Sequence, residues 1–173
     1  MANEYKICIP ARIESSRLEQ NLLCNVNGKT IIQRTWERCL ESSADTVTVI
    51  TDSTEIFDLI SDLGGDCFLS QSVHESGTDR LAEYTKYQNL PEDLILINVQ
   101  GDEPLIDINS VNKLADFVRS NGSNYATICK PFESSEDEAD VNKVSPPMFS
   151  WSAATTPGRS SGASRPPLQS SAG

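Results

Sequence analysis

Strand-like and helix-like segments alternate over the first 130 residues, and this alternation constrains the fold more than any other feature of the chain. Short apolar runs rich in β-branched residues predict buried strands at residues 6–9, 46–51, 94–99 and 125–129. Apolar residues recur at helical spacing over residues 32–40, 56–63 and 111–118. A strand-helix alternation implies a mostly parallel sheet with helices on both faces, so we expect a three-layer αβα fold.

Ligands of such sheets bind beyond the carboxyl ends of the strands. The loop after the first predicted strand, residues 10–18, carries Arg12 and Arg17 together with Ser15. Guanidinium groups present forks of donors that suit phosphate oxygens. The alternative is a solvated loop whose arginines pair with acidic side chains. The chain has neither a GxGxxG nor a GxxxxGK[ST] motif, so a phosphate cradle here would use arginines and backbone N–H groups.

A second polar segment, residues 74–80, precedes a helical pattern. Ser76 or Thr78 is predicted to cap this helix, and Gly77 allows a close backbone approach. The positive end of the helix would favour an anion or a polar base edge. An ordinary capped helix start explains the pattern as well.

The run at residues 94–99 leads directly into Gln100-Gly101-Asp102-Glu103-Pro104. A carboxylate at the end of a central strand, beside a glycine that lets a ligand approach, is where an α/β nucleotide enzyme holds Mg²⁺. Asp102 is therefore the candidate metal ligand. Because Gly, Asp and Pro all favour turns, an ordinary turn is the alternative.

The formal net charge of −11 disfavours binding to nucleic acid or to an anionic membrane. We find no apolar stretch long enough to span a bilayer and no signal-peptide pattern, and therefore expect a cytoplasmic protein. The five cysteines match neither a CxxC clip nor a disulfide framework and are predicted to be reduced. His74 is the single histidine, which argues against a zinc site.

Residues 145–173 differ in composition from the rest of the chain. They contain no acidic residue, whereas all 25 acidic residues lie at or before Asp140. Eight serines, five prolines and three glycines lie in this stretch. Such a segment buries too little apolar surface to offset its ordering entropy, so it is predicted to be a disordered tail after a folded unit of residues 1–144.

Taken together, the three loops resemble those of the 3-deoxy-manno-octulosonate cytidylyltransferase (CMP-Kdo synthetase) family. The similarity extends over about residues 5–143, in matching order and spacing. It is carried by residues 9–12, Ser15, residues 17–18, 27–29, 51–52, 64–65, 74–80 and 98–104. The resemblance implies a Rossmann-like nucleotide-diphospho-sugar transferase fold, of which residues 1–144 form a partial nucleotide-binding domain.

The resemblance also implies a reaction: an eight-carbon sugar acid, Kdo or a related one, attacks the α-phosphorus of CTP with Mg²⁺ present, giving CMP-Kdo and pyrophosphate for lipopolysaccharide-type sugar activation. By this resemblance Arg12 and Arg17 hold the triphosphate, and Asp102 binds the metal; these three are the expected catalytic residues. Ser76 and Arg80 shape the cytosine and ribose pocket, and Gln100 faces the substrate. The remaining expected substrate-binding residues are Ala11, Ser15 and Gly77.

The chain departs from the family pattern in its first loop, where Asn21 stands in place of the phosphate-binding lysine and Glu19 adds a negative charge. Family members also continue with a segment that completes the sugar-acid pocket, supplies a second metal-binding carboxylate and forms most of the dimer contact. After about residue 144 the similarity fades, so we do not expect the family-type homodimer. The alternative function is a catalytically impaired nucleotide-binding remnant or regulatory homologue.

Overall fold

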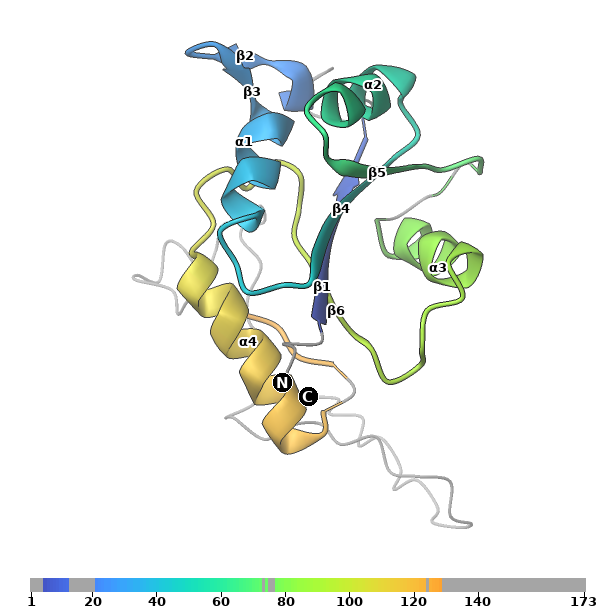
Figure 1. Ribbon diagram of the computed structural model, residues 1–173, viewed down its shortest axis with the longest axis vertical. Helices are drawn as coiled ribbons and strands as arrows, with labels where there is room; N and C mark the ends of the chain where they lie inside the picture. Colours follow the sequence, from blue (N-terminus) through green and yellow to red (C-terminus); the bar gives the residue numbers. More distant parts are fainter. Residues whose placement is uncertain (1–4, 13–20, 73, 75–76, 124, 129–173) are drawn as a thin grey trace, which may run out of the picture.

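The computed structural model describes residues 5–12, 21–72, 74, 77–123 and 125–128. Its centre is a four-stranded parallel sheet with the strand order β5-β4-β1-β6 (Figure 1). The strands are β1 (Tyr5–Ala11), β4 (Thr46–Thr51), β5 (Asp66–Leu69) and β6 (Ile95–Asn98). Three of them confirm predicted strands, whereas β5 was missed. A two-stranded hairpin, β2 (Asn25–Val26) and β3 (Lys29–Thr30), turns through Asn27 and Gly28, both with positive φ.

In the described part of the chain, four α-helices flank the sheet: α1 (Ile31–Cys39), α2 (Thr54–Asp62), α3 (Gly77–Tyr87) and α4 (Ile108–Asn121). A 3-10 helix, η1 (Asn21–Leu23), precedes the hairpin. The side chains of Thr30, Ser53 and Asp107 accept hydrogen bonds from backbone N–H groups in the first turns of α1, α2 and α4, which fixes where these helices begin. All three predicted helical segments are thereby confirmed.

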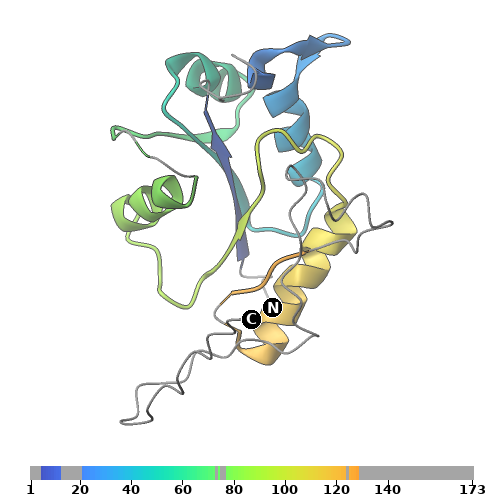
Figure 2. The ribbon, with the colours of Figure 1, turned by 180° about the vertical axis from the view of Figure 1, so that it is seen from behind.

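The helices form two layers around the sheet. Helices α1 and α4 lie on one side and α3 on the other, and the reverse view agrees (Figures 1 and 2). Side chains alternate along β1 accordingly: Ile7 and Ile9 pack in a core cluster with residues of α1, α2 and α4, whereas Cys8 packs against Tyr84 of α3. The three-layer αβα prediction is confirmed.

Pairing of β1 with its two neighbours ends at different heights. With β4 the register continues to Ala11↔Thr51, but with β6 it stops at Cys8↔Asn98. The Val99 N–H donates to the Cys8 carbonyl at 3.0 Å. The next β1 residue facing β6 is Pro10, which has no N–H to continue the ladder. The chain after β6 therefore leaves the sheet, whereas β1 continues to pair with β4 as far as Ala11.

The strand predicted at residues 125–129 is wrong over residues 125–128, which have no regular secondary structure. Tyr125 and Ile128 are 68% and 51% exposed. A β-branched run becomes a strand only when it finds a pairing partner and a surface on which to bury its side chains, and this run has neither among the described residues. Cys129 and the predicted tail, residues 145–173, lie outside the described residues.

Candidate functional site

The carboxyl ends of β1, β4 and β6 bring together the polar residues singled out in the sequence. Ala11 ends β1, Arg12 follows it, and Asp52 follows β4. The remaining members lie in the first turn of α3, which contains Gly77 and Arg80, and in the loop after β6, which contains Gln100 and Asp102. Ser15, Arg17 and Ser76 lie outside the described residues. Helix α3 begins at Gly77, so Thr78 lies inside the helix and is not its cap.

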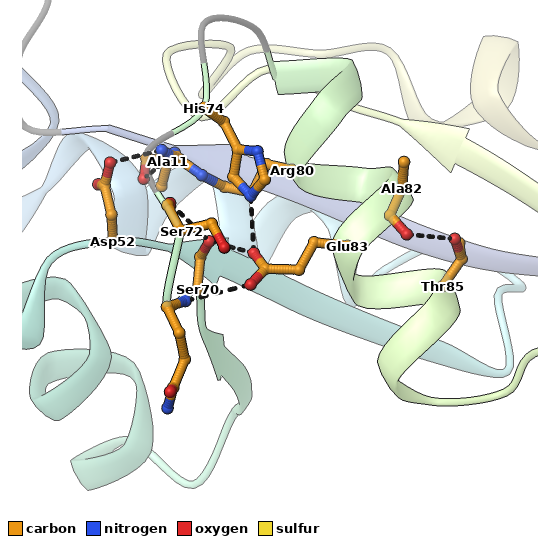
Figure 3. A network of polar contacts seen from close by, with 10 residues as sticks. Ala11, Asp52, Ser70, Ser72, His74, Arg80, Ala82, Glu83 and Thr85 are labelled. Carbon is orange, nitrogen blue, oxygen red and sulfur yellow. Dashed lines mark hydrogen bonds and ion pairs between the residues drawn. The ribbon is translucent and has the colours of Figure 1, made fainter.

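The side chain of Arg80 links the carboxyl ends of β1 and β4. Its side chain is fully buried, and its two terminal nitrogens donate to the Ala11 carbonyl at 3.1 Å and to Asp52 Oδ2 at 2.5 Å (Figure 3). The buried Nε has no hydrogen-bond partner among the described residues. Burial lowers the pKa of the Arg80 guanidinium; Asp52 opposes this effect, and the positive charge of Arg12 adds to it. Arg80 therefore fixes the backbone from which Arg12 projects.

Arg12 is exposed at the end of β1 and lies close enough to Arg80 for their charges to interact. Asp52 offsets the charge of Arg80, so the positive potential here comes mainly from the Arg12 guanidinium, in a chain of net charge −11. Such a potential, next to backbone at a strand end, attracts an anion such as phosphate. The phosphate-binding role expected for Arg12 stays a prediction.

A second polar cluster surrounds Glu83 of α3 (Figure 3). Its carboxylate accepts hydrogen bonds from the Ser70 hydroxyl, from the Gln71 N–H at 3.3 Å and from His74 Nε2 at 2.7 Å. The Ser70 hydrogen bond and the other donors lower the pKa of Glu83 to about 2, against the opposing effect of burial. The sequence analysis missed Glu83, although its position three residues after Arg80 on one helix face was a usable signal.

The loop after β6 is held against α1. The hydroxyl of the buried Thr35 donates to the Gly101 carbonyl at 2.8 Å, and Arg38 Nε donates to the Ile106 carbonyl at 3.1 Å. A Cβ at Gly101 would lie 3.2 Å from both Pro10 O and Ile32 Cδ1. A side chain here would require Pro10 or Ile32 to shift by a few tenths of an ångström, so internal packing favours glycine; its expected role in ligand approach stays a prediction.

Pro10 is also contacted from α3. A Cβ at Gly77 would lie 3.3 Å from the Cβ and Cγ atoms of Pro10. The close backbone approach expected at Gly77 is thus an approach to Pro10. Two glycines from two different loops pack on one proline, so the end of β1, the start of α3 and the loop after β6 share a common contact.

Gln100 and Asp102 are exposed on the loop after β6. Gln100 Nε2 donates to Asn98 Oδ1 at 3.4 Å. Gln100 and Asn98 line a cavity of about 490 Å³ beside β6. No group of three or more His, Cys, Asp or Glu side chains gathers among the described residues. A single exposed carboxylate nevertheless fits Mg²⁺, which keeps several waters and takes its other ligands from substrate phosphates.

Four cysteines are described, and all are free thiols, as predicted. Burial raises the pKa of Cys8, Cys39 and Cys67 to about 12, whereas Cys24 is exposed. No described helix combines the length and hydrophobicity that crossing a bilayer requires.

Comparison with known proteins places this geometry in context. Residues 7–148 match the family model described as cytidylyltransferase. The chain is 41% identical over 141 residues to 3-deoxy-manno-octulosonate cytidylyltransferase of Saccharophagus degradans, covering 81% of this chain and 55% of that protein. The enzyme of the same name from Pectobacterium carotovorum is 39% identical over 140 residues, with 81% and 56% covered. The chain thus spans about half the length of the relatives it matches.

Solved structures agree with the sequence comparison. The structure of CMP:2-keto-3-deoxy-manno-octonic acid synthetase complexed with CTP is similar with a TM-score of 0.62 at 38% identity, covering 68% of this chain and 48% of that one. A cytidylyltransferase from Leptospira borgpetersenii shares the fold, with a TM-score of 0.59 at 24% identity, over 68% of this chain and 50% of that chain.

Proposed function

Because the chain belongs to the cytidylyltransferase family, we propose that it binds CTP at the carboxyl ends of β1, β4 and β6 and supports cytidylyl transfer to 3-deoxy-manno-octulosonate. In this reaction a hydroxyl oxygen of the sugar acid bonds to the α-phosphorus of CTP, the hydroxyl proton is lost, and pyrophosphate leaves. The products are CMP-Kdo and pyrophosphate. Formation of CMP-Kdo activates the sugar for lipopolysaccharide-type synthesis.

The observation that carries this proposal is the position of Arg12 at the end of β1, beside the buried Arg80 of α3. Arg12 is exposed, and the buried Arg80 holds the Ala11 carbonyl immediately before it. A triphosphate carries several negative charges, and transfer of its α-phosphorus depends on positioning and charge neutralisation more than on covalent chemistry by the protein. Arg12 supplies the charge, and the Arg80 clamp supplies the fixed position.

Asp102 is the residue we assign to Mg²⁺ in this proposal. It is exposed and follows Gly101, whose carbonyl is fixed by Thr35, so the carboxylate projects from a backbone that is held in place. When bound, Mg²⁺ would neutralise charge on the phosphate oxygens. Gln100, on the same loop, is proposed to contact the substrate. Arg17, Ser15 and Ser76 retain the roles that the family resemblance implies.

The second candidate function is nucleotide binding without turnover. One observation favours it: Asn21 stands where the family resemblance places a phosphate-binding lysine. Loss of one ammonium beside a triphosphate weakens stabilisation of the transferring group. In this case CTP would bind, and a regulatory role would depend on the bound nucleotide.

Calorimetric titration with CTP, with and without Mg²⁺, tests the nucleotide site. We expect Mg²⁺-dependent binding that Arg12→Ala weakens about tenfold and that Asp102→Ala renders nearly independent of Mg²⁺. Matched controls are Arg119→Ala and Asp116→Ala, which remove exposed charges of the same kind from α4. No binding at millimolar CTP would refute the site.

Pyrophosphate release from CTP and Kdo separates the two candidate functions. Turnover that depends on Kdo supports the transferase. CTP binding without turnover supports the non-catalytic alternative.

A further inference from the structure

We propose that Glu83 is a positioning residue of the nucleotide site: it fixes Ser70 and Gln71 against α3 and holds the ring of His74 in one orientation and one tautomer. The consequence for nucleotide binding rests on the function proposed above. Glu83 is not proposed to touch CTP.

The first argument is the convergence of donors on one carboxylate. The Ser70 hydroxyl and His74 Nε2 both donate to Glu83 Oε2, and the Gln71 N–H donates to Oε1 (Figure 3). The side chains of His74 and Glu83 are only 14% and 20% exposed. A carboxylate that gathers these three donors fixes the positions of Ser70, Gln71 and His74 relative to α3, because no neutral side chain could accept all three hydrogen bonds.

The second argument is where this segment is attached. The Ser70 N–H donates to the Thr51 carbonyl at 2.7 Å, at the end of β4 and next to Asp52. Asp52 in turn pairs with Arg80, which lies one helical turn before Glu83. Helix α3 thus holds the strand ends through Arg80 and the segment after β5 through Glu83. Both contacts set the position of the helix start that packs on Pro10.

The third argument concerns the protons of His74. An ionised carboxylate can only accept, so Nε2 carries a hydrogen and Nδ1 is the ring atom left for any other partner. Glu83 is kept ionised, since its hydrogen bonds lower its pKa to about 2. This is the arrangement by which a carboxylate orients a functional histidine in many sites.

His74 is the single histidine of the chain, so its imidazole nitrogens can be observed without ambiguity by long-range ¹H–¹⁵N NMR of histidine-labelled protein. We expect the full chain at pH 7.5 to show Nε2 protonated as a single species. Glu83→Gln should show mixed tautomers and should weaken Mg²⁺-dependent CTP binding about tenfold. The control Glu92→Gln makes the same charge change at an exposed turn residue and should alter neither.

A histidine signature and a CTP affinity that are unchanged in Glu83→Gln would overturn the proposal. If Glu83→Gln does not fold, His74→Gln removes the ring and leaves the carboxylate, and it should weaken CTP binding several-fold; full affinity in that variant would also overturn the proposal. The tautomer comparison needs no nucleotide. It therefore decides the positioning role even if the wild-type chain fails to bind CTP, a result that would refute the proposed function instead.

Discussion

Arg80 and Asp52 form an ion pair in which the arginine is fully buried and the aspartate is partly exposed to water. The arginine side chain is 0% exposed and the aspartate side chain 40%. Water therefore still solvates the carboxylate, whereas the guanidinium depends on Asp52 and on the Ala11 carbonyl. Removing the carboxylate charge leaves a buried cation without its counter-ion, which is costly.

Asp52→Asn should accordingly lower the free energy of unfolding by about 2 kcal/mol, less than the loss of a fully buried partner because Asp52 is partly solvated. Urea denaturation measures the change. Asp116→Asn is the control, since its partner Arg119 is itself 41% exposed; it should cost no more than about 0.5 kcal/mol. Equal losses of unfolding free energy in Asp52→Asn and Asp116→Asn would show that burial of Arg80 does not determine the cost.

The depressed pKa of Glu83 makes stability depend on pH in the acid range. Its pKa falls from 4.5 to about 2 on folding, so the folded state binds fewer protons than the unfolded state between these values. The stabilisation is complete above about pH 4.5 and is lost as the pH falls towards 2. Unfolding free energies measured from pH 5 to 2.5 should fall more steeply for the wild type than for Glu83→Gln. Parallel curves would show that Glu83 does not carry this effect.

Thr35→Val tests the contact that holds the Asp102 loop. The substitution keeps the side-chain shape and removes the hydroxyl that donates to the buried Gly101 carbonyl. An unsatisfied buried acceptor should cost about 1–2 kcal/mol. Thermal and urea unfolding provide the measurement. Thr85→Val, which removes an exposed hydroxyl bonded within α3, should change stability by less than about 0.5 kcal/mol.

Thiol labelling should distinguish the cysteines. Burial that raises the pKa of Cys8, Cys39 and Cys67 to about 12 leaves almost no thiolate at neutral pH, whereas Cys24 is exposed. In a Cys129→Ser background, we expect iodoacetamide to modify one thiol rapidly in the folded protein, and peptide mass spectrometry should locate it at Cys24. Rapid labelling that persists in a further Cys24→Ser variant would contradict this assignment.

Asn21→Lys restores the charge that the family resemblance places in the first loop. Asn21 begins η1, immediately before the hairpin. An added ammonium near a triphosphate should tighten CTP binding about three- to tenfold, and the gain should shrink as salt is raised. Calorimetry at two ionic strengths checks both points. An unchanged affinity at low salt would place residue 21 away from the phosphates.

The main strands were predictable because their side-chain pattern is a local property. Residues 46–51 consist of Val, Ile and Thr alone, and a buried parallel strand reads as such a run. Strand β5 was missed for the opposite reason: it has four residues, begins at the exposed Asp66 and is only half-buried elsewhere. The run at residues 125–129 had the right composition, but composition does not supply a pairing partner.

In the site, residue types were predictable and their contacts were not. Gly101 was recognised, but the reason for glycine lies in Pro10 and Ile32, which are far away in the sequence. Arg80 lies one turn before Glu83 on the same helix, but the donors to Glu83 come from the segment that precedes α3 and could not be assigned from the sequence. Only the path of the folded chain brings such groups together.

The contacts of Gly77 and Gly101 with Pro10 bear on how charge is arranged before any ligand arrives. Each glycine lets its backbone pack so closely on Pro10 that an added Cβ would lie 3.2–3.3 Å from it, so the end of β1, the start of α3 and the loop after β6 are in mutual contact. Arg12 directly follows β1 and Asp102 directly follows Gly101, so both charged residues are attached to backbone next to these contacts. For the proposed nucleotide site, close packing of the backbone that carries both charges would reduce the binding free energy spent on reorganising the protein.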